Sequence, residues 1–210
     1  MTFKDRFDAG NQLATLLIKD VDIKKNRDNT VVVSLLRGGI ITGEAIAKHL
    51  AVANLPLVVT KIPAPHNPEL AIGALCFDVT YLKKDVVYSL SLDKSTINKQ
   101  IEIAREKFNS YLEKFGLNAD YYPKRIRNKI TVLVDDGIAT GSTVRAGLLY
   151  LKTLSPDKVY LAAPVAPTDF DATGFDKFFV IQKDPYFSAV SQYYQHFPQI
   201  SDEEVKKLLQ

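Results

Sequence analysis

Two adjacent carboxylates, followed by a short run of small and hydroxyl-bearing residues, could together bind a phosphorylated sugar. Asp135 and Asp136 close an apolar segment, and a loop over residues 137–141 leads into a helical pattern. The amides from Ala139 to Thr143 would lie at a helix N-terminus, where the helix dipole favours an anion such as phosphate. The two carboxylates would repel phosphate and instead need hydroxyl donors, such as a ribose diol. The spacing therefore predicts a ribose 5-phosphate site.

The predicted phosphate cradle comprises Ala139, Thr140, Gly141, Ser142 and Thr143. Its three hydroxyls add hydrogen-bond donors to the amides, so the cradle needs no lysine of its own. An acidic turn before a capped helix is the alternative interpretation. The combination of an apolar strand, an acid pair, small residues and three hydroxyls favours the ligand site.

Apolar strands and amphipathic segments alternate along the chain and indicate an α/β fold. We expect strands at 30–36, 57–60, 130–134, 159–163 and 178–181, and helices at 5–18, 40–50, 95–115, 142–154 and 201–209. This alternation predicts a mostly parallel, twisted sheet with helices on both faces. Ligands bind beyond the carboxyl ends of such strands. The acid-pair loop and the basic turn Arg37-Gly38-Gly39 should therefore meet at one edge.

Residues 62–92 depart from this pattern. The segment contains Pro63, Pro65 and Pro68, followed by short alternating runs. It predicts a loop followed by small antiparallel strands. Without a clear linker elsewhere, we expect residues 1–210 to form a single domain.

The composition excludes several classes of protein. The chain has 210 residues, a net charge of +3 and one cysteine, Cys76, which lies in an apolar run and is expected to be buried. The charge is too small to argue for nucleic-acid binding. No apolar run is long enough to cross a bilayer, and the polar start does not resemble a signal peptide. These features predict a cytoplasmic location.

The segment Val132–Thr143 resembles the phosphoribosyl diphosphate (PRPP) signature of type I phosphoribosyltransferases. Two further segments resemble a microbial branch of that family: Lys61-(x)₃-Pro65-x-Asn67-Pro68-Glu69, and a tail containing Tyr194, Phe197, Pro198 and Asp202-Glu203-Glu204. The resemblance implies that residues 62–92 form the family's flexible loop. It also implies that residues from about 165 to 210 form the hood over the base.

The resemblance also implies roles for individual residues. Asp135, Asp136 and Glu69 would be catalytic, with His66 as a further candidate in the loop. Leu36, Arg37, Gly38, Gly39 and Lys61 would hold the pyrophosphate, with a cis peptide expected at Leu36–Arg37; a solvated surface position remains the alternative for Lys61. Ile138, Tyr186, Phe187 and Lys177 would contact the base. Mg²⁺ would be held through PRPP and waters rather than by the protein directly, and a homodimer is expected.

The acceptor base is the least constrained feature. In the family that the chain resembles, enzymes for hypoxanthine and guanine usually have an aspartate at the position of Ala139, where it can exchange the proton on purine N7. A methyl group cannot exchange a proton, and adenine, xanthine and orotate enzymes commonly have alanine there. Ala139 therefore favours adenine, with a 6-oxopurine as the alternative. A second alternative is a PRPP-binding regulator that binds RNA, for which the nearest basic run is 124–129.

Overall fold

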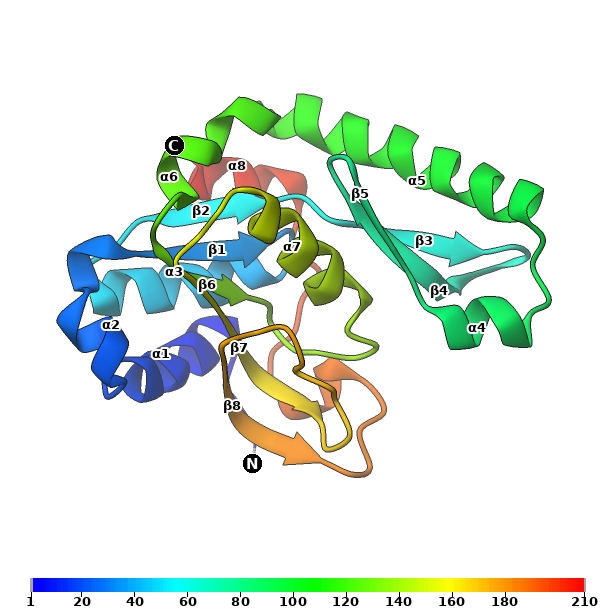
Figure 1. Cartoon of the computed structure of the whole chain (residues 1–210). Helices are drawn as coiled ribbons and strands as arrows, with labels where there is room; N and C mark the ends of the chain where they lie inside the picture. Colours follow the sequence, from blue (N-terminus) through cyan, green and yellow to red (C-terminus); the bar gives the residue numbers. More distant parts are fainter. Residues whose placement is uncertain (1, 210) are drawn as a thin grey trace.

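The computed structural model describes residues 2–209, apart from the side chain of Glu69. Its centre is a five-stranded sheet in which every neighbouring pair is parallel (Figure 1). In spatial order the strands are β2 (Asn54–Leu57), β1 (Thr30–Leu35), β6 (Ile130–Val134), β7 (Lys158–Pro167) and β8 (Lys177–Asp184). The predicted parallel sheet is confirmed.

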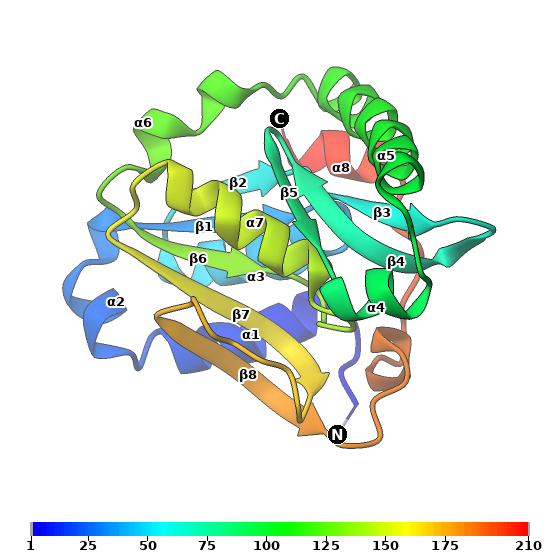
Figure 2. The ribbon, with the colours of Figure 1, turned by 45° about the vertical axis from the view of Figure 1, so that its right-hand side comes forward.

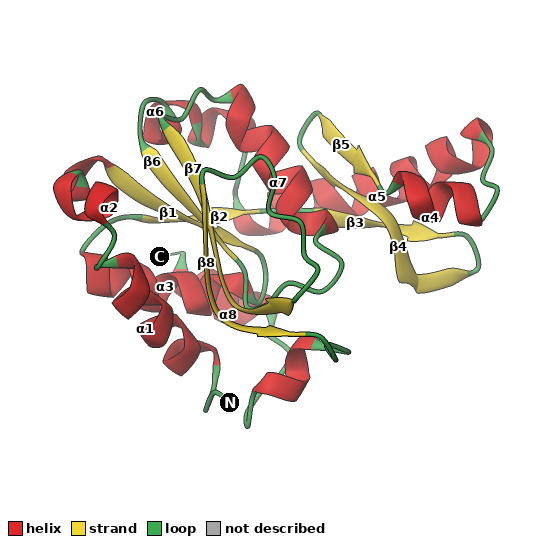
Figure 3. Cartoon of the chain, turned by 60° about the horizontal axis from the view of Figure 1, so that its bottom comes forward, coloured by secondary structure: helices red, strands yellow, loops and turns green. Residues whose placement is uncertain are grey.

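Helices cover both faces of this sheet, as the nearly continuous apolar strands require. On one face, Val32 and Val132 pack with Leu13 and Ile46 of α1 (Arg6–Leu17) and α3 (Gly39–Leu50), which lie side by side in Figure 3. On the other face, the strand residues that alternate with those of the first face pack with α7 (Ser142–Thr153). The alternation of strand side chains between the two faces therefore builds two separate cores.

A second, antiparallel sheet lies to one side of the first. It consists of β3 (Thr60–Ala64), β4 (Asn67–Cys76) and β5 (Val79–Leu82), followed by α4 (Lys84–Ser89) and the long α5 (Lys94–Phe115). Helix α7 lies between the two sheets (Figure 2), and its Tyr150 ring stacks on Phe77 with 4.6 Å between centroids. The buried thiol of Cys76 confirms the expectation for that residue.

The small antiparallel strands predicted within residues 62–92 are confirmed, but the loop expected to precede them from Pro63 is already part of a hairpin. Pro63 lies within β3 and Pro68 within β4, and the pairing register shifts on both sides of Pro63. Such an irregularity accommodates a residue that cannot donate to the ladder. The predicted strand at 57–60 is also divided, since β2 ends at Leu57 and β3 starts at Thr60 in the other sheet.

The N-terminal segment pairs with the C-terminal tail around Tyr194. Phe3 pairs with Tyr194 in an isolated parallel bridge, and their rings lie 5.4 Å apart. The last helix, α8 (Asp202–Leu208), starts at the capping box that Ser201 forms with Glu204, as the sequence predicts. The remaining short elements are α2 (Val21–Lys25), α6 (Pro123–Ile126) and the 3₁₀ turns at Arg27–Asn29, Ala119–Tyr121 and Val190–Tyr193.

Candidate active site

The loops that follow β1 and β6 meet at the carboxyl edge of the parallel sheet. A Cβ atom on Gly38 would lie 1.9 Å from Asp136 Oδ2, and one on Gly39 would lie 2.8 Å from the carbonyl oxygen of Val134. Both glycines are thus required by the close packing of the two loops. The Leu36–Arg37 peptide bond is cis, which confirms the expectation. The structure therefore brings the predicted pyrophosphate loop directly against the acid pair.

The predicted phosphate cradle has its backbone donors available. Within residues 2–209, no group accepts a hydrogen bond from the amides of residues 139–143. Gly141 takes a left-handed conformation (φ 73°) just before α7, and its carbonyl accepts from Arg145. Ala139 and Thr140 are exposed, whereas Ser142 is fully buried. The arrangement can bind an anion mainly through main-chain amides.

Cationic side chains that the sequence did not point to border the same hollow. It has a volume of about 270 Å³ and includes Thr140, Gly141, Lys83, Arg145 and Tyr81 in its lining. Arg145 is fixed by the carboxylate of Asp171 at 2.8 Å and by the carbonyls of Asp171 and Thr173. Lys83 and Arg145 thus add positive charge beside the loop, and Asp169 and Asp171 of the same lining offset part of it.

The two acids occupy different environments. Burial raises the pKa of the Asp135 carboxyl well above its ordinary value, and the adjacent Asp136 carboxylate raises it further, while the charge of Lys61 acts in the opposite sense. Asp135 Oδ1 accepts a hydrogen bond from the Asp136 amide at 2.9 Å. Asp136 instead forms an ion pair, with its Oδ2 2.7 Å from Arg6 Nε. Carboxyl groups accept hydrogen bonds from sugar hydroxyls, and a carboxyl with a raised pKa can also donate one when it is protonated.

The pyrophosphate side already contains ion pairs. Arg37 Nη1 lies 3.3 Å from Asp202 Oδ1 of α8, and Lys114 Nζ of α5 lies 2.6 Å from Asp202 Oδ2. Lys61, on β3, is exposed and close enough to affect the ionisation of Asp135. The positive charges assigned to this side from the sequence are therefore gathered at the acid pair, with Asp202 as the partner of Arg37.

Arg6, Tyr194 and Asp202 were not assigned to the site from the sequence. The Tyr194 hydroxyl donates to the main-chain carbonyl of Asp136, so the tail reaches the acid pair as well as Arg37. Burial, and then the charge of Asp136, raises the pKa of this phenol, which keeps it a hydrogen-bond donor. The tail motif in the sequence could have indicated Tyr194 and Asp202 as site residues. The sequence around Arg6 contains no pattern that would indicate its pairing with Asp136.

The predicted base contacts have mixed outcomes. Phe187 stacks on Tyr193 with 5.5 Å between ring centroids, whereas Tyr186 is 88 % exposed and packs against little. Ile138 is 1 % exposed and its amide donates to the Val165 carbonyl, so in this conformation it has almost no surface for a base. The assignment of Ile138 to the base therefore stays a prediction, and in this conformation the residue is part of the core.

The structure places Lys177, the remaining residue assigned to the base, away from the acid pair. Its Nζ lies 2.6 Å from Asp20 Oδ2 and 2.9 Å from Asp22 Oδ2. Lys177 is the first residue of β8, and the parallel sheet places strand starts at the edge opposite the acid pair. The lysine belongs to a structural ion-pair network that also includes Lys158 and the Tyr160 hydroxyl.

The two catalytic candidates of the predicted loop, Glu69 and His66, lie on the hairpin formed by β3 and β4. Glu69 lies in β4, and its side chain is outside the described atoms. His66 lies in the turn between β3 and β4 with φ 60° and is exposed.

In the basic run 124–129, the guanidinium of Arg125 lies 4.2 Å from the centre of the Tyr121 ring and Ile126 is buried, so the run is partly structural.

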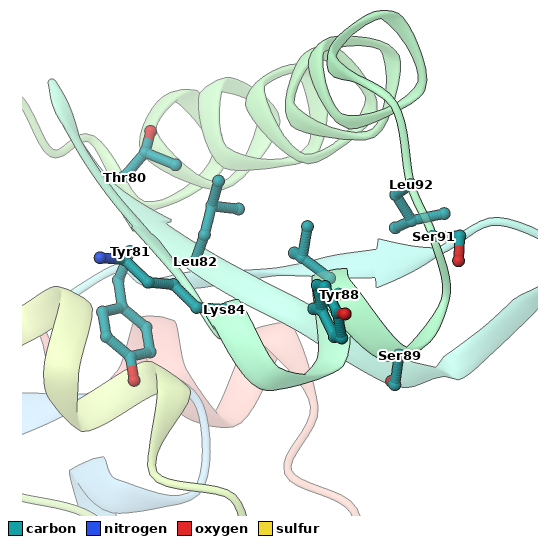
Figure 4. A pocket seen from close by; sticks show the side chains of 9 residues that line it. Thr80, Tyr81, Leu82, Lys84, Tyr88, Ser89, Ser91 and Leu92 are labelled. Atoms are coloured by element: carbon teal, nitrogen blue, oxygen red, sulfur yellow. The ribbon is translucent and has the colours of Figure 1, made fainter.

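A larger hollow lies on the small sheet, away from the acid pair. Its volume is about 950 Å³, and its lining comes from β5, α4 and the turn after α4, including Leu82, Val87 and Leu92 (Figure 4). Tyr81 lines both this hollow and the phosphate hollow. The larger one contains none of the predicted site residues.

Comparison with known proteins finds similarity to proteins named as phosphoribosyl transferases. Two strains of Mycobacterium tuberculosis have proteins named "Putative phosphoribosyl transferase" that are 36 % identical over 99 % of this chain. The chain spans about half (46 %) of the length of each of them. No family model matches the chain.

Solved structures show the same architecture. The crystal structure of TT1426 from Thermus thermophilus matches the whole chain and 98 % of its own length, with 27 % identity and a TM-score of 0.75. A purine phosphoribosyltransferase from Pyrococcus horikoshii shares the fold at 12 % identity, with a TM-score of 0.52 over 95 % of this chain and 97 % of its own. Separately, none of the helices within residues 2–209 is long and apolar enough to span a membrane.

Proposed function

We propose that the chain is a type I phosphoribosyltransferase, which transfers the 5-phosphoribosyl group of PRPP to a purine base and releases pyrophosphate. The relatives are about twice as long as this chain, so the activity is proposed from the site. The observation that carries the proposal is the row of available amides at 139–143 beside the acid pair. Together they match a 5-phosphate and the ribose hydroxyls next to it.

In the proposed reaction, a ring nitrogen of the base forms a bond to C1′ as the bond from C1′ to the pyrophosphate oxygen breaks. The transition state has oxocarbenium character, so the protein contributes mainly position and charge. The cradle anchors the 5-phosphate, Asp135 and Asp136 hold the ribose hydroxyls, and Arg37, Lys61 and the 36–39 loop face the leaving pyrophosphate. Asp202 must give up part of its contact with Arg37 when pyrophosphate binds.

Mg²⁺ fits this site as an ion bound to the substrate. Within residues 2–209 there is no cluster of three or more His, Cys, Asp or Glu side chains that could hold a metal by itself. The two adjacent carboxylates can contact its waters and the sugar hydroxyls. When bound, the ion supplies positive charge that neutralises the pyrophosphate.

Adenine is the acceptor that we favour. Ala139 faces the phosphate hollow and offers no group that could exchange a proton with purine N7. Lys177 lies at the wrong edge of the sheet to donate to a 6-oxo group, which removes one feature that would favour hypoxanthine or guanine. A 6-oxopurine remains the alternative acceptor.

A panel of bases tests the proposal. The protein is incubated with PRPP, Mg²⁺ and adenine, hypoxanthine, guanine, xanthine or orotate, and pyrophosphate release is measured with the Asp136→Asn variant as the negative control. We expect release with adenine and formation of AMP. Release with no base of the panel would contradict the proposed function, and release with hypoxanthine or guanine alone would contradict only the base. Sedimentation of the same sample tests the expected homodimer.

A further inference from the structure

The side chain of Arg6 links three distant parts of the chain at the acid pair. Its Nε donates to Asp136 Oδ2 at 2.7 Å and its Nη1 donates to the Pro198 carbonyl at 2.8 Å. Its guanidinium carbon lies 3.6 Å from the centre of the Phe197 ring. The residue is only 6 % exposed. A guanidinium taken out of water to this extent needs all of these partners to offset its desolvation.

These contacts leave one oxygen of the Asp136 carboxylate available. Oδ2 is bound by Arg6, and the main-chain carbonyl of Asp136 is bound by the Tyr194 hydroxyl. Within the described part of the chain, no N–H or hydroxyl group donates to Oδ1, and the Asp135 carboxyl lies within hydrogen-bonding reach of the Asp136 carboxyl. Asp136, Arg6, Arg37 and Gly38 together line a hollow of about 530 Å³. The carboxylate is thus held in one orientation beside open space.

Arg6 is also the cation in direct contact with the acid pair. Asp135 is the like-charged neighbour of Asp136 on the same loop, Lys61 acts on Asp135 from β3, and Arg37 is bound to Asp202. Tyr194, from the tail, supplies only a neutral donor. Two neighbouring carboxylates without a direct counter-charge would share a proton. Arg6 therefore provides the counter-charge that directly contacts Asp136.

We propose that Arg6 is a positioning residue of the phosphoribosyl site, which orients the Asp136 carboxylate so that it receives a ribose hydroxyl. The proposal rests on the proposed function, because it names ribose as the group that Asp136 holds. Phe197 and Pro198 fix the guanidinium in turn, so the tail contributes to ribose binding without touching the sugar. The competing explanation is that Arg6 only holds α1 against the C-terminal tail.

Three variants separate these explanations: Arg6→Gln removes the charge, Arg6→Lys keeps the charge without the forked geometry, and Phe197→Leu removes the stacking partner alone. The pKa of the Asp136 carboxyl is measured by carbon NMR titration, with Asp136→Asn to assign the signal, and PRPP binding is measured by calorimetry between pH 5 and 8. Thermal unfolding reports whether each variant is folded.

In Arg6→Gln we expect the pKa of Asp136 to rise and PRPP affinity to fall at least about tenfold at pH 7, the range for a lost hydrogen bond to a charged group. As the pH is lowered, the variant should lose PRPP affinity at a higher pH than the wild type, because Asp136 then needs a higher pH to ionise. Arg6→Lys should restore the pKa more than the affinity, and Phe197→Leu should weaken binding less than Arg6→Gln. If Arg6 only held the N-terminal helix against the C-terminal tail, Arg6→Gln would lower the Tm without changing the pKa of Asp136 or the pH dependence of PRPP binding.

An unchanged Asp136 pKa and PRPP affinity in folded Arg6→Gln would overturn the proposal. If that variant fails to fold, an unchanged PRPP affinity in both Arg6→Lys and Phe197→Leu would overturn it in its place. A wild-type chain that does not bind PRPP would instead overturn the proposed function and the ribose contact with it. The NMR titration decides the effect of Arg6 on Asp136 in either case.

Discussion

The phosphate cradle and the acid pair are neighbours in sequence but are built in different ways. The cradle at 139–143 is one continuous segment whose amides point away from any described partner, and its conformation follows from Gly141 and the start of α7. The acid pair is enclosed by groups from α1, the loop after β1, β3 and the C-terminal tail, and Asp136 is already bound to Arg6. One site is local and the other is assembled.

The difference determines how each site responds to substitution. A local site loses affinity only when its own residues change, because its donors belong to the backbone of one loop. An assembled site depends on every segment that reaches it, so residues 130 positions apart, such as Arg6 and Asp136, can affect the same carboxylate. Carboxylates held near each other also carry a cost in stability that backbone amides do not. The following predictions test this contrast.

The largest effect is expected from Asp136→Asn. The variant loses both the charge that favours an oxocarbenium-like transition state and the ion pair with Arg6, so kcat/KM should fall by about 10² or more. Steady-state pyrophosphate release measures it. Near-normal turnover would remove the acid pair from the mechanism and with it the contrast between the two sites.

A smaller effect, confined to binding, is expected from Thr140→Val in the local site. The variant keeps the shape of the exposed side chain and loses one hydroxyl donor to the phosphate, so the Kd for PRPP should rise by roughly tenfold. The Tm should not change, since Thr140 makes only one long contact, 3.4 Å from Ser142 Oγ. Calorimetry with PRPP measures the change, and Thr15→Val on the exposed side of α1 is the matched control. An unchanged Kd would contradict the phosphate cradle.

Asp135→Asn should make the protein more stable while it lowers activity. Burial, the neighbouring carboxylate and the opposing charge of Lys61 together leave the pKa of Asp135 raised in the folded state, so the folded state binds more protons than the unfolded state as pH rises. Wild-type stability therefore falls from about pH 4, the unfolded pKa, until the folded pKa is passed. The Tm advantage of the variant should be absent below about pH 4 and grow above it, by roughly 2–4 °C for each kcal/mol.

Thermal unfolding of the wild type and Asp135→Asn between pH 3 and 8 checks this dependence. The Asn side chain can still accept the Asp136 amide through its oxygen, so the loop geometry is preserved. A variant that is less stable than the wild type at pH 8 would show that ionised Asp135 is well compensated in the assembled site.

The smallest effect is expected from Lys177→Gln. The variant loses the ion pairs with Asp20 and Asp22 at the far edge of the sheet, so only the Tm should decrease slightly. The Kd for PRPP and the order of preference among bases should be those of the wild type. A change in base preference would return Lys177 to the site and contradict its assignment to the structural network.

Much of this architecture could be predicted from the sequence because it depends on local patterns. The apolar run Ile130–Val134 predicted the strand with its observed bounds, and Ser201 marked the start of the last helix. The Pro-rich hairpin was mistaken for a loop, since propensity alone does not report a bulged pairing such as the one around Pro63. The division of 57–60 between two sheets likewise depends on which partner each strand finds.

The sequence by itself determined the phosphate loop, the acid pair, the parallel sheet and the edge at which they meet, because each follows from residue type and short-range spacing. Only the tertiary structure decided that Asp136 is paired with Arg6, that Arg37 is paired with Asp202, and that Lys177 lies at the opposite edge. The physical reason is that an ion pair requires two side chains within a few ångströms of each other. For residues far apart in the sequence, the packing of the whole chain sets that distance.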